Sequence, residues 1–176
     1  CQSYVTNPQY IHIEKDDSYD EDEILDFLQK RQGILEGVCI TGGEPLMQST
    51  ISDFIKKVKE LGFSVKLDTN GTFPEKLIAL AESKLIDYVA MDIKNSPERY
   101  AETVGRLGYD TDRISESINI LVMSGIEYEF RTTVVSELHS MEDIAKIGDW
   151  IKGARHWYLQ NFVDSGQLID SACKGV

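Results

Sequence analysis

The 176-residue sequence predicts an α/β fold built on a parallel sheet. Two observations support this prediction. Short apolar runs rich in β-branched residues alternate with segments whose apolar residues recur at helical spacing. Successive apolar runs start about 25 to 40 residues apart, which leaves room for one crossover helix between parallel strands. The pattern does not decide whether the sheet stays open or curls toward a barrel.

Each predicted strand is a short apolar run that ends at polar or glycine residues. The five strands cover residues 37–41, 63–68, 87–94, 127–135 and 156–162. The predicted helices cover residues 20–31, 50–61, 74–84, 112–124 and a segment that begins at Ser140. Asp20 is a candidate N-cap, Pro74 suits a first helical position, and residues 140–143 resemble a capping box. Gly62 and Gly125 end the helices that precede them.

The apolar faces of these helices are expected to pack on the sheet and to serve no ligand. This expectation applies to Ile51, Phe54, Ile55 and Val58 and to Ile144, Ile147 and Ile151; on the helix over residues 20–31, Ile24, Phe27 and Leu28 share one face.

Composition narrows the function classes. The formal net charge of −12 disfavours nucleic acid as a partner, because phosphates would be repelled. No apolar run reaches the ~20 residues of a membrane span and no leader pattern is found, so we expect a cytoplasmic protein without a membrane partner. The acidic run at residues 16–23 is interpreted as a helix start rather than a docking patch for a basic partner. Three scattered cysteines predict no disulfide framework, with Cys39 buried in a strand.

Polar residues stand at the carboxyl end of every predicted strand, which is where parallel α/β folds bind ligands. They are Thr41, Gly42, Gly43 and Glu44; Asp68, Thr69 and Asn70; Asp92 and Lys94; Arg131; and Gln160 and Asn161. Each has a structural alternative, such as a tight turn or an ion pair between Asp92 and Lys94. Together they favour a ligand site, because charges on buried strands are costly unless they are paired or bound. We therefore expect Asp92 and Lys94 to share one face near Gly43.

The residue types indicate the class of ligand. A double glycine lets backbone groups approach an amino-acid moiety closely. Lys94 and Arg131 suit a carboxylate, Asp68 suits a cation or an ammonium, and Asp92 suits ribose hydroxyls or an ammonium. This set fits an amino acid joined to a nucleoside better than a phosphate ligand, and no Walker, GxGxxG or GxSxG motif is found.

Three motifs at the strand ends carry a resemblance to a known family. Residues 40–46 (ITGGEPL) resemble the GGEP motif of radical S-adenosylmethionine (SAM) enzymes. Residues 66–71 (KLDTNG) and 88–94 (YVAMDIK) resemble strand motifs of the activating-enzyme subgroup. Residues 94–105 (KNSPERYAETVG) and 158–162 (YLQNF) are similar to anaerobic ribonucleoside-triphosphate reductase activating proteins. The resemblance covers nearly the whole chain and implies a partial (β/α) barrel of the radical SAM type.

The resemblance also implies roles for individual residues. Thr41, Gly42, Gly43 and Glu44 would contact the SAM amine, largely through backbone atoms. Asp68 and Thr69 would help to hold the SAM carboxylate, through a monovalent cation. Asp92 and Lys94 would bind the ribose and carboxylate region, and Arg131 would lie near the methionyl end.

The implied function is an activase that uses SAM and a [4Fe–4S] cluster to generate a glycyl radical on a partner enzyme. The implied partners are a glycyl-radical enzyme, anaerobic ribonucleotide reductase above all, and a flavodoxin or ferredoxin-type reductant. Pyruvate formate-lyase activation is the alternative within this class. A SAM- or nucleoside-binding module without redox activity and a structural α/β domain without a ligand are alternatives from other classes.

The amino end departs from the family pattern. The family binds its cluster through CxxxCxxC, and Cys1 matches only the third cysteine. We therefore interpret residues 1–176 as one radical SAM core domain truncated at both ends, without its first strand and most of its cluster loop. Cys1 is the expected metal ligand, and this stretch alone is expected to hold no stable cluster and to be inactive.

Overall fold

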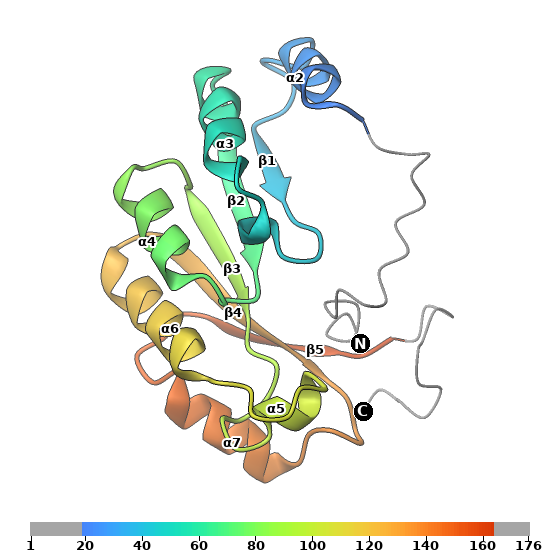
Figure 1. Ribbon diagram of the computed structural model, residues 1–176, viewed down its shortest axis with the longest axis vertical. Coiled ribbons are helices and arrows are strands. Elements are labelled where there is room, and N and C mark those ends of the chain that lie inside the picture. The colour runs from blue at the N-terminus through green and yellow to red at the C-terminus, as the bar shows by residue number, and fades with distance from the viewer. Residues whose placement is uncertain (1–18, 164–176) are drawn as a thin grey trace.

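The computed structural model describes residues 19–163, which form one parallel five-stranded sheet. The strands are β1 (Gly37–Ile40), β2 (Ser64–Thr69), β3 (Tyr88–Asp92), β4 (Glu127–Val134) and β5 (Trp157–Asn161). They lie in the order β1-β2-β3-β4-β5, and every neighbouring pair is parallel (Figure 1). The carboxyl ends of all five strands therefore meet at one edge of the sheet.

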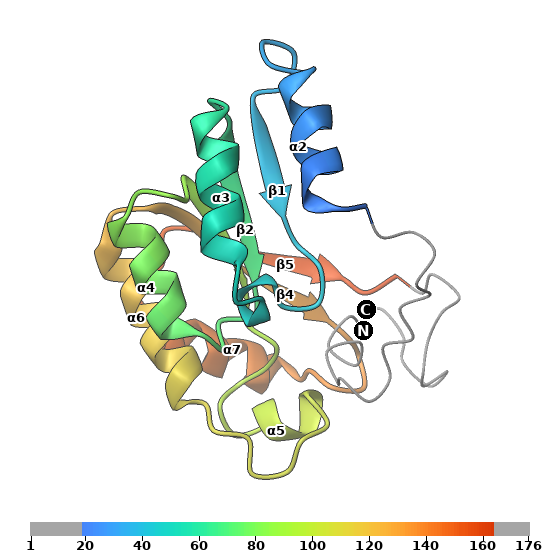
Figure 2. The same cartoon turned by 45° about the horizontal axis from the view of Figure 1, so that its top comes forward.

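The helices α3, α4, α6 and α7 connect successive strands and lie on one side of the sheet (Figures 1 and 2). The helices are α2 (Glu21–Gln29), η2 (Pro45–Met47), α3 (Ile51–Glu60), α4 (Pro74–Glu82), α5 (Tyr100–Thr103), α6 (Asp112–Ser124) and α7 (Met141–Trp150). Because βα crossovers are right-handed and the strand order never reverses, the crossover helices all fall on the same face. This one-sided winding is the barrel type, in contrast to doubly wound sheets with helices on both faces.

The hydrophobic core lies between the sheet and these helices. On β2 and β4 the buried side chains alternate with partly exposed ones, whereas β3 buries three residues in a row, Val89, Ala90 and Met91. Leu67, Met91 and Phe130 are fully buried on the helix side. On the other face Lys66, Asp68 and Glu129 are charged and only partly buried. This inner face is therefore polar, unlike the packed interior of a closed barrel.

The sheet is strongly twisted, so that β5 runs nearly crosswise to β1 in Figure 1. Both outer strands, β1 and β5, have one neighbour each within residues 19–163. The sheet is thus an open, curved one, consistent with part of a barrel. None of the helices in this part of the chain is long and apolar enough to span a membrane.

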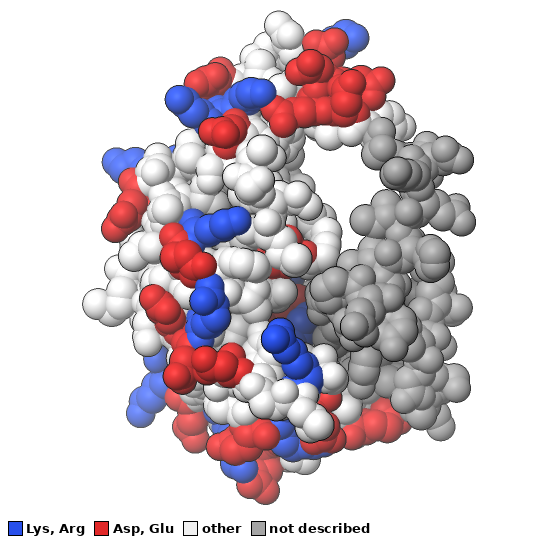
Figure 3. All heavy atoms as spheres, in the orientation of Figure 1, with Lys and Arg blue, Asp and Glu red and all other residues white. Residues whose placement is uncertain are grey.

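The local signals in the sequence are confirmed. Asp20 caps α2 in a capping box with Glu23, and Ser140 does the same for α7 with Asp143. Acidic side chains gather over α2, at the top of Figure 3. Because Glu21, Asp22 and Glu23 occupy its first turn, these acids belong to a helix start, as expected. The expected apolar faces of α3 and α7 also belong to the core or pack against it.

One helix face is buried only in part, and one prediction about burial is wrong. On α2, Leu25 and Leu28 face the core, whereas Ile24 and Phe27, on the expected apolar face, are 37% and 49% exposed. Cys39 is exposed, because alternation along β1 places it on the polar face opposite Ile40. The short helix α5 was not predicted.

Candidate functional site

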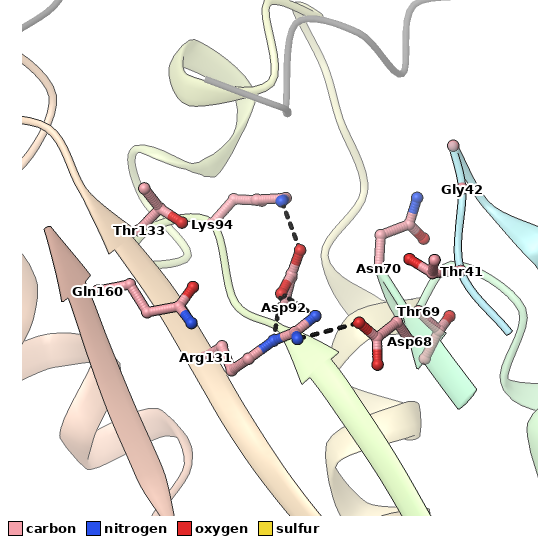
Figure 4. A pocket seen from close by; sticks show the side chains of 11 residues that line it. Thr41, Gly42, Asp68, Thr69, Asn70, Asp92, Lys94, Arg131, Thr133 and Gln160 are labelled. Carbon is pink, nitrogen blue, oxygen red and sulfur yellow. Dashed lines mark hydrogen bonds and ion pairs between the residues drawn. The ribbon is translucent and has the colours of Figure 1, made fainter. Parts of the chain in front are cut away.

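A pocket of about 350 Å³ lies at the carboxyl edge of the sheet, within the range of small-molecule sites (Figure 4). All five strands or the segments that follow them contribute to it. Its lining residues are Thr41, Gly42, Gly43, Asp68, Thr69, Asn70, Asp92, Lys94, Arg131, Thr133 and Gln160. Eight of the nine residues expected to bind a cofactor line this pocket, and Glu44 is the exception.

Arg131 is the centre of the ion pairs in the pocket. Its Nη1 lies 3.0 Å from Asp68 Oδ2, and its Nε and Nη2 both lie 3.1 Å from Asp92 Oδ1. Burial opposes the positive charge of Arg131, but the carboxylates of Asp92 and Asp68 outweigh it and raise the pKa of the guanidinium. Arg131 therefore stays charged and holds two carboxylates from neighbouring strands beside each other.

Lys94 and Asp92 share one side of the chain, as their spacing predicted. The Lys94 ammonium lies 2.8 Å from Asp92 Oδ2, so Asp92 stands between two cations (Figure 4). Both residues line the same pocket as Gly43, which confirms that expectation. Lys94 has only Asp92 as its ion-pair partner within residues 19–163, and an ammonium has three donors. Within the described residues, two of its three donors are therefore left for a bound carboxylate.

The turn after β1 brings bare backbone to the rim of the pocket. Gly42 has φ +137°, a conformation that side-chain-bearing residues rarely adopt. A Cβ atom built at Gly42 would meet no atom within 4 Å. The glycine is thus required by backbone conformation, and open space lies beside it. This geometry suits the close approach of a ligand to backbone amides and carbonyls.

Glu44 does not point into the pocket but joins two turns. Its carboxylate accepts hydrogen bonds from Thr69 Oγ1 at 2.8 Å, Asn70 N at 2.7 Å and Leu46 N at 3.1 Å. Burial raises the pKa of Glu44, and these three hydrogen bonds counteract the rise. The side chain therefore fixes the glycine turn against the end of β2. Any contact of Glu44 with a ligand is left to its backbone.

Three further pocket residues were not among the expected cofactor contacts. Asn70 and Gln160 are strand-end residues that the sequence pattern had marked, whereas Thr133 was overlooked. Thr133 follows Arg131 by two positions on β4 and so shares its face, a signal that was available. Within residues 19–163, neither Thr133 nor Gln160 makes a side-chain hydrogen bond. They provide a neutral polar end of the pocket, opposite the glycine turn (Figure 4).

Below the pocket the inner face of the sheet carries a second polar cluster. Lys66 Nζ lies 3.4 Å from Glu129 Oε1 and 3.8 Å from Asp68 Oδ1. The Tyr88 hydroxyl donates to Glu129 Oε2 at 2.9 Å, and burial together with that carboxylate raises the pKa of Tyr88 to about 12. Cys39 Sγ lies 3.7 Å from Asp68, and burial and this carboxylate raise the pKa of the thiol. Through Lys66 and Cys39 this cluster contacts Asp68 on the side away from the pocket and so helps to fix its carboxylate.

The predicted metal ligand Cys1 lies outside the described residues. Within residues 19–163, no group of three His, Cys, Asp or Glu side chains is placed to hold a metal ion. Asp68, the carboxylate expected near a monovalent cation, already faces Arg131 and Lys66. A third cation at this carboxylate is therefore not favoured by the local charges.

The fold and the pocket define an α/β protein with a polar pocket of small-molecule size at the carboxyl ends of its strands. Comparison with protein families identifies the family. The model of the radical SAM superfamily matches residues 1–151. The chain belongs to the radical SAM superfamily, as the resemblance of its strand motifs implied.

Curated relatives and solved structures agree with this assignment. The chain is 35% identical over 143 residues to the “Putative glycyl-radical enzyme activating enzyme” of Methanocaldococcus jannaschii, covering 78% of this chain and 57% of the relative. It is 31% identical over 141 residues to 7-carboxy-7-deazaguanine synthase of Thermococcus kodakarensis, covering 80% of this chain and 53% of the relative. The chain thus spans about half the length of these relatives.

Two solved structures share the fold. A domain of a pyruvate-formate lyase-activating enzyme from Bacteroides vulgatus aligns with a TM-score of 0.55 and 16% identity, over 65% of this chain and 70% of that one. Streptococcus suis SuiB aligns with a TM-score of 0.65 and 18% identity, over 86% of this chain and 36% of that one. At these identities the likeness concerns the fold alone.

Proposed function

We propose that this chain is the SAM-binding core of a radical SAM activating enzyme that generates a glycyl radical on a partner enzyme. The observation that carries the proposal is the pocket, in which Asp68, Asp92, Lys94 and Arg131 meet the bare turn at Gly42. A ligand with a carboxylate, an ammonium and ribose hydroxyls complements this set of charges. SAM has all three groups.

Different pocket residues bind different groups of SAM. Lys94 holds the SAM carboxylate, because it has donors left beyond its pair with Asp92. The backbone at Thr41, Gly42 and Gly43 receives the methionyl amine. Arg131 keeps Asp68 and Asp92 in place, and Asp92 takes the ribose hydroxyls.

Thr133 and Gln160, at the other end of the pocket, offer neutral hydrogen-bonding groups to the adenine. A [4Fe–4S] cluster, when bound, supplies the electron that cleaves the sulfonium and so produces the 5′-deoxyadenosyl radical that takes a hydrogen atom from the substrate. The cluster ligands would include Cys1.

Two observations support an activating enzyme, and the second favours anaerobic ribonucleotide reductase as its partner. The relative from Methanocaldococcus jannaschii is named for glycyl-radical enzyme activation. The segment 94–105 resembles anaerobic ribonucleoside-triphosphate reductase activating proteins in sequence. A flavodoxin or ferredoxin-type protein would supply the electron, and the reaction would take place in the cytoplasm.

The proposal is tested by following the hydrogen atom that passes from a glycine Cα of the partner enzyme to the 5′-deoxyadenosyl radical. The full-length protein is reconstituted anaerobically and mixed with SAM, dithionite and an anaerobic ribonucleotide reductase whose glycines carry deuterium at Cα. We expect a carbon-centred radical by electron paramagnetic resonance, and 5′-deoxyadenosine that has gained deuterium. If 5′-deoxyadenosine forms without deuterium from any glycyl-radical enzyme, the activase proposal is wrong.

A second candidate is chemistry on a small heterocycle. Three of the curated relatives are 7-carboxy-7-deazaguanine synthases, from Thermococcus kodakarensis, Methanopyrus kandleri and Thermoplasma acidophilum. The same reconstituted protein is therefore incubated with the precursor of that compound. Formation of 7-carboxy-7-deazaguanine would favour this candidate over the activase.

A further inference from the structure

Lys94 lies just beyond the end of β3, where the sheet no longer fixes the chain. The backbone N–H of Ile93 makes a 2.8 Å bond to the carbonyl of Arg131, and Thr132 Oγ1 donates to the Ile93 carbonyl at 2.8 Å. The next residue is Lys94, whose ammonium reaches the pocket. Its position depends on contacts from outside the sheet.

His139, from the loop between β4 and α7, supplies one of these contacts. Its Nε2 lies 2.8 Å from the Lys94 carbonyl oxygen, and its Nδ1 lies 3.1 Å from the Val135 backbone N. The Val135 carbonyl already accepts from the backbone N–H groups of Leu138 and His139. Nδ1 is therefore the acceptor for the Val135 N–H, and the proton on Nε2 is donated to Lys94.

Tyr100 supplies a second contact. Its side chain is 1% exposed and packs between Tyr109, with ring centroids 5.4 Å apart, and Trp150, at 5.8 Å. Burial raises the pKa of Tyr100, and a hydrogen bond with the Lys94 backbone counteracts part of this rise. Side chains from two separate segments thus hold the backbone of one residue.

A buried polar network fixes the loop that carries His139 to the segment that follows Lys94. Asn95 is fully buried, and its Nδ2 donates to the Leu138 carbonyl and to Thr103 Oγ1, both at 2.8 Å. Asp143 accepts from Ser96 Oγ at 3.2 Å and from Arg99 Nη1 at 2.9 Å. Such networks are rigid when they are fully satisfied. The network reaches the pocket through Lys94.

We propose that His139 is a positioning residue that holds the Lys94 backbone, so that the Lys94 ammonium stays where the ligand carboxylate binds. This inference rests on the proposed function, because it assumes that Lys94 binds SAM. His139 touches neither the pocket nor the ligand in this arrangement, and it acts through Lys94 alone. The segment 95–103, whose sequence matched no catalytic motif, thereby gains a role as the frame of a ligand contact.

A double-mutant cycle tests the proposal. The dissociation constant of S-adenosylhomocysteine is measured by calorimetry on the full-length reconstituted protein and on three variants: His139→Leu, Lys94→Met and the double variant. We expect His139→Leu to weaken binding between about threefold and about tenfold, the range that one lost hydrogen bond corresponds to. In the Lys94→Met background the same change should have no further effect, because the ammonium whose position His139 sets is gone, although the backbone contact remains.

Two more variants separate positioning from folding. His139→Gln keeps a side-chain N–H donor and should restore most of the affinity, and His156→Leu changes an exposed histidine outside the pocket and should leave it unchanged. If His139→Leu weakens binding equally in both backgrounds, or not at all, the positioning role is wrong. If the wild-type protein fails to bind the probe, the proposed function itself is wrong.

Discussion

The carboxylate of Glu44 accepts a hydrogen bond of 2.8 Å from the hydroxyl of Thr69, and this bond joins the glycine turn after β1 to the end of β2. Both residues were expected to contact the cofactor from their position in the strand-end motifs. Thr69 lines the pocket, whereas the Glu44 side chain stands behind it as a support. The acid in the GGEP turn thus shapes the pocket from outside.

Replacing Glu44 by alanine should destabilise the fold. The change leaves the Thr69 hydroxyl and the Asn70 N–H without their buried acceptor, so we expect the free energy of unfolding to fall by about 3 kcal/mol. Urea unfolding at neutral pH, followed by circular dichroism, measures the change. Glu60→Ala, at an exposed position on α3, is the control and should stay within about 0.5 kcal/mol of the wild type. Equal losses in both variants would contradict the supporting role of Glu44.

The architecture of the chain could be predicted because local signals and fold rules agree. Capping residues such as Asp20 and Ser140 mark helix starts, and strand–helix alternation leaves few topologies for a parallel sheet. The clustering of polar strand ends follows from the topology, since parallel strands all end at one edge. Most of the candidate pocket was therefore predictable without any coordinates.

The errors arise where tertiary context decides. Helix α2 packs on the core only through Leu25 and Leu28, so its apolar face is wider than the area that is buried. In the sequence Cys39 belongs to a short apolar run, so it was expected to be buried. Only the alternation of side chains along β1 shows that it faces the polar side of the sheet. The role of His139 was not predictable either, because 45 residues separate it from Lys94 in the chain.

Removing the charge of Arg131 should weaken ligand binding, because Asp68 and Asp92 lose the cation that pairs with both of them. In Arg131→Met nothing then holds these two carboxylates at 3.0 and 3.1 Å from a common partner. We expect the dissociation constant of S-adenosylhomocysteine to increase by more than about tenfold, as the loss of a partly buried charged pair usually implies. Calorimetry on the reconstituted protein measures the effect.

Arg155→Met serves as the matched control for Arg131. Arg155 pairs with Glu127 at 3.1 Å, and both side chains are more than half exposed. Exposed pairs contribute little, so this variant should bind the probe as the wild type does. Wild-type affinity in Arg131→Met would mean that the ion pairs of the pocket are not part of the ligand site.

The buried carboxylate of Asp143 should make stability depend on pH in acid. Burial alone would raise its pKa, but hydrogen bonds from Ser140 and the charge of Arg99 outweigh it, so the pKa is well below its usual range. Asp143 therefore contributes stability above its unfolded pKa of about 3.9, and this contribution is lost as pH falls through the lower folded value. The difference in unfolding free energy between wild type and Asp143→Asn should be constant above about pH 5 and shrink below about pH 4. A difference that is independent of pH would show that Asp143 is not held as a carboxylate by this network.

Cys39 should be open to chemical modification in the folded protein, although its reactivity depends on pH. Its side chain is exposed on the polar face of β1, so iodoacetamide can reach it without unfolding. Burial around the sulfur and the nearby charge of Asp68 raise the pKa of the thiol, and the reactive thiolate is therefore scarce at neutral pH. We expect slow alkylation of the Cys39 peptide at about pH 7 and a rate that still increases above about pH 9, resolved from the other two cysteines by mass spectrometry. Asp68→Asn removes the negative charge and should make the thiol react faster at neutral pH, whereas Asp112→Asn, on α6, should not. If Cys39 stays unmodified until the protein is unfolded in urea, it is buried, and the placement of β1 with its polar face open would be wrong.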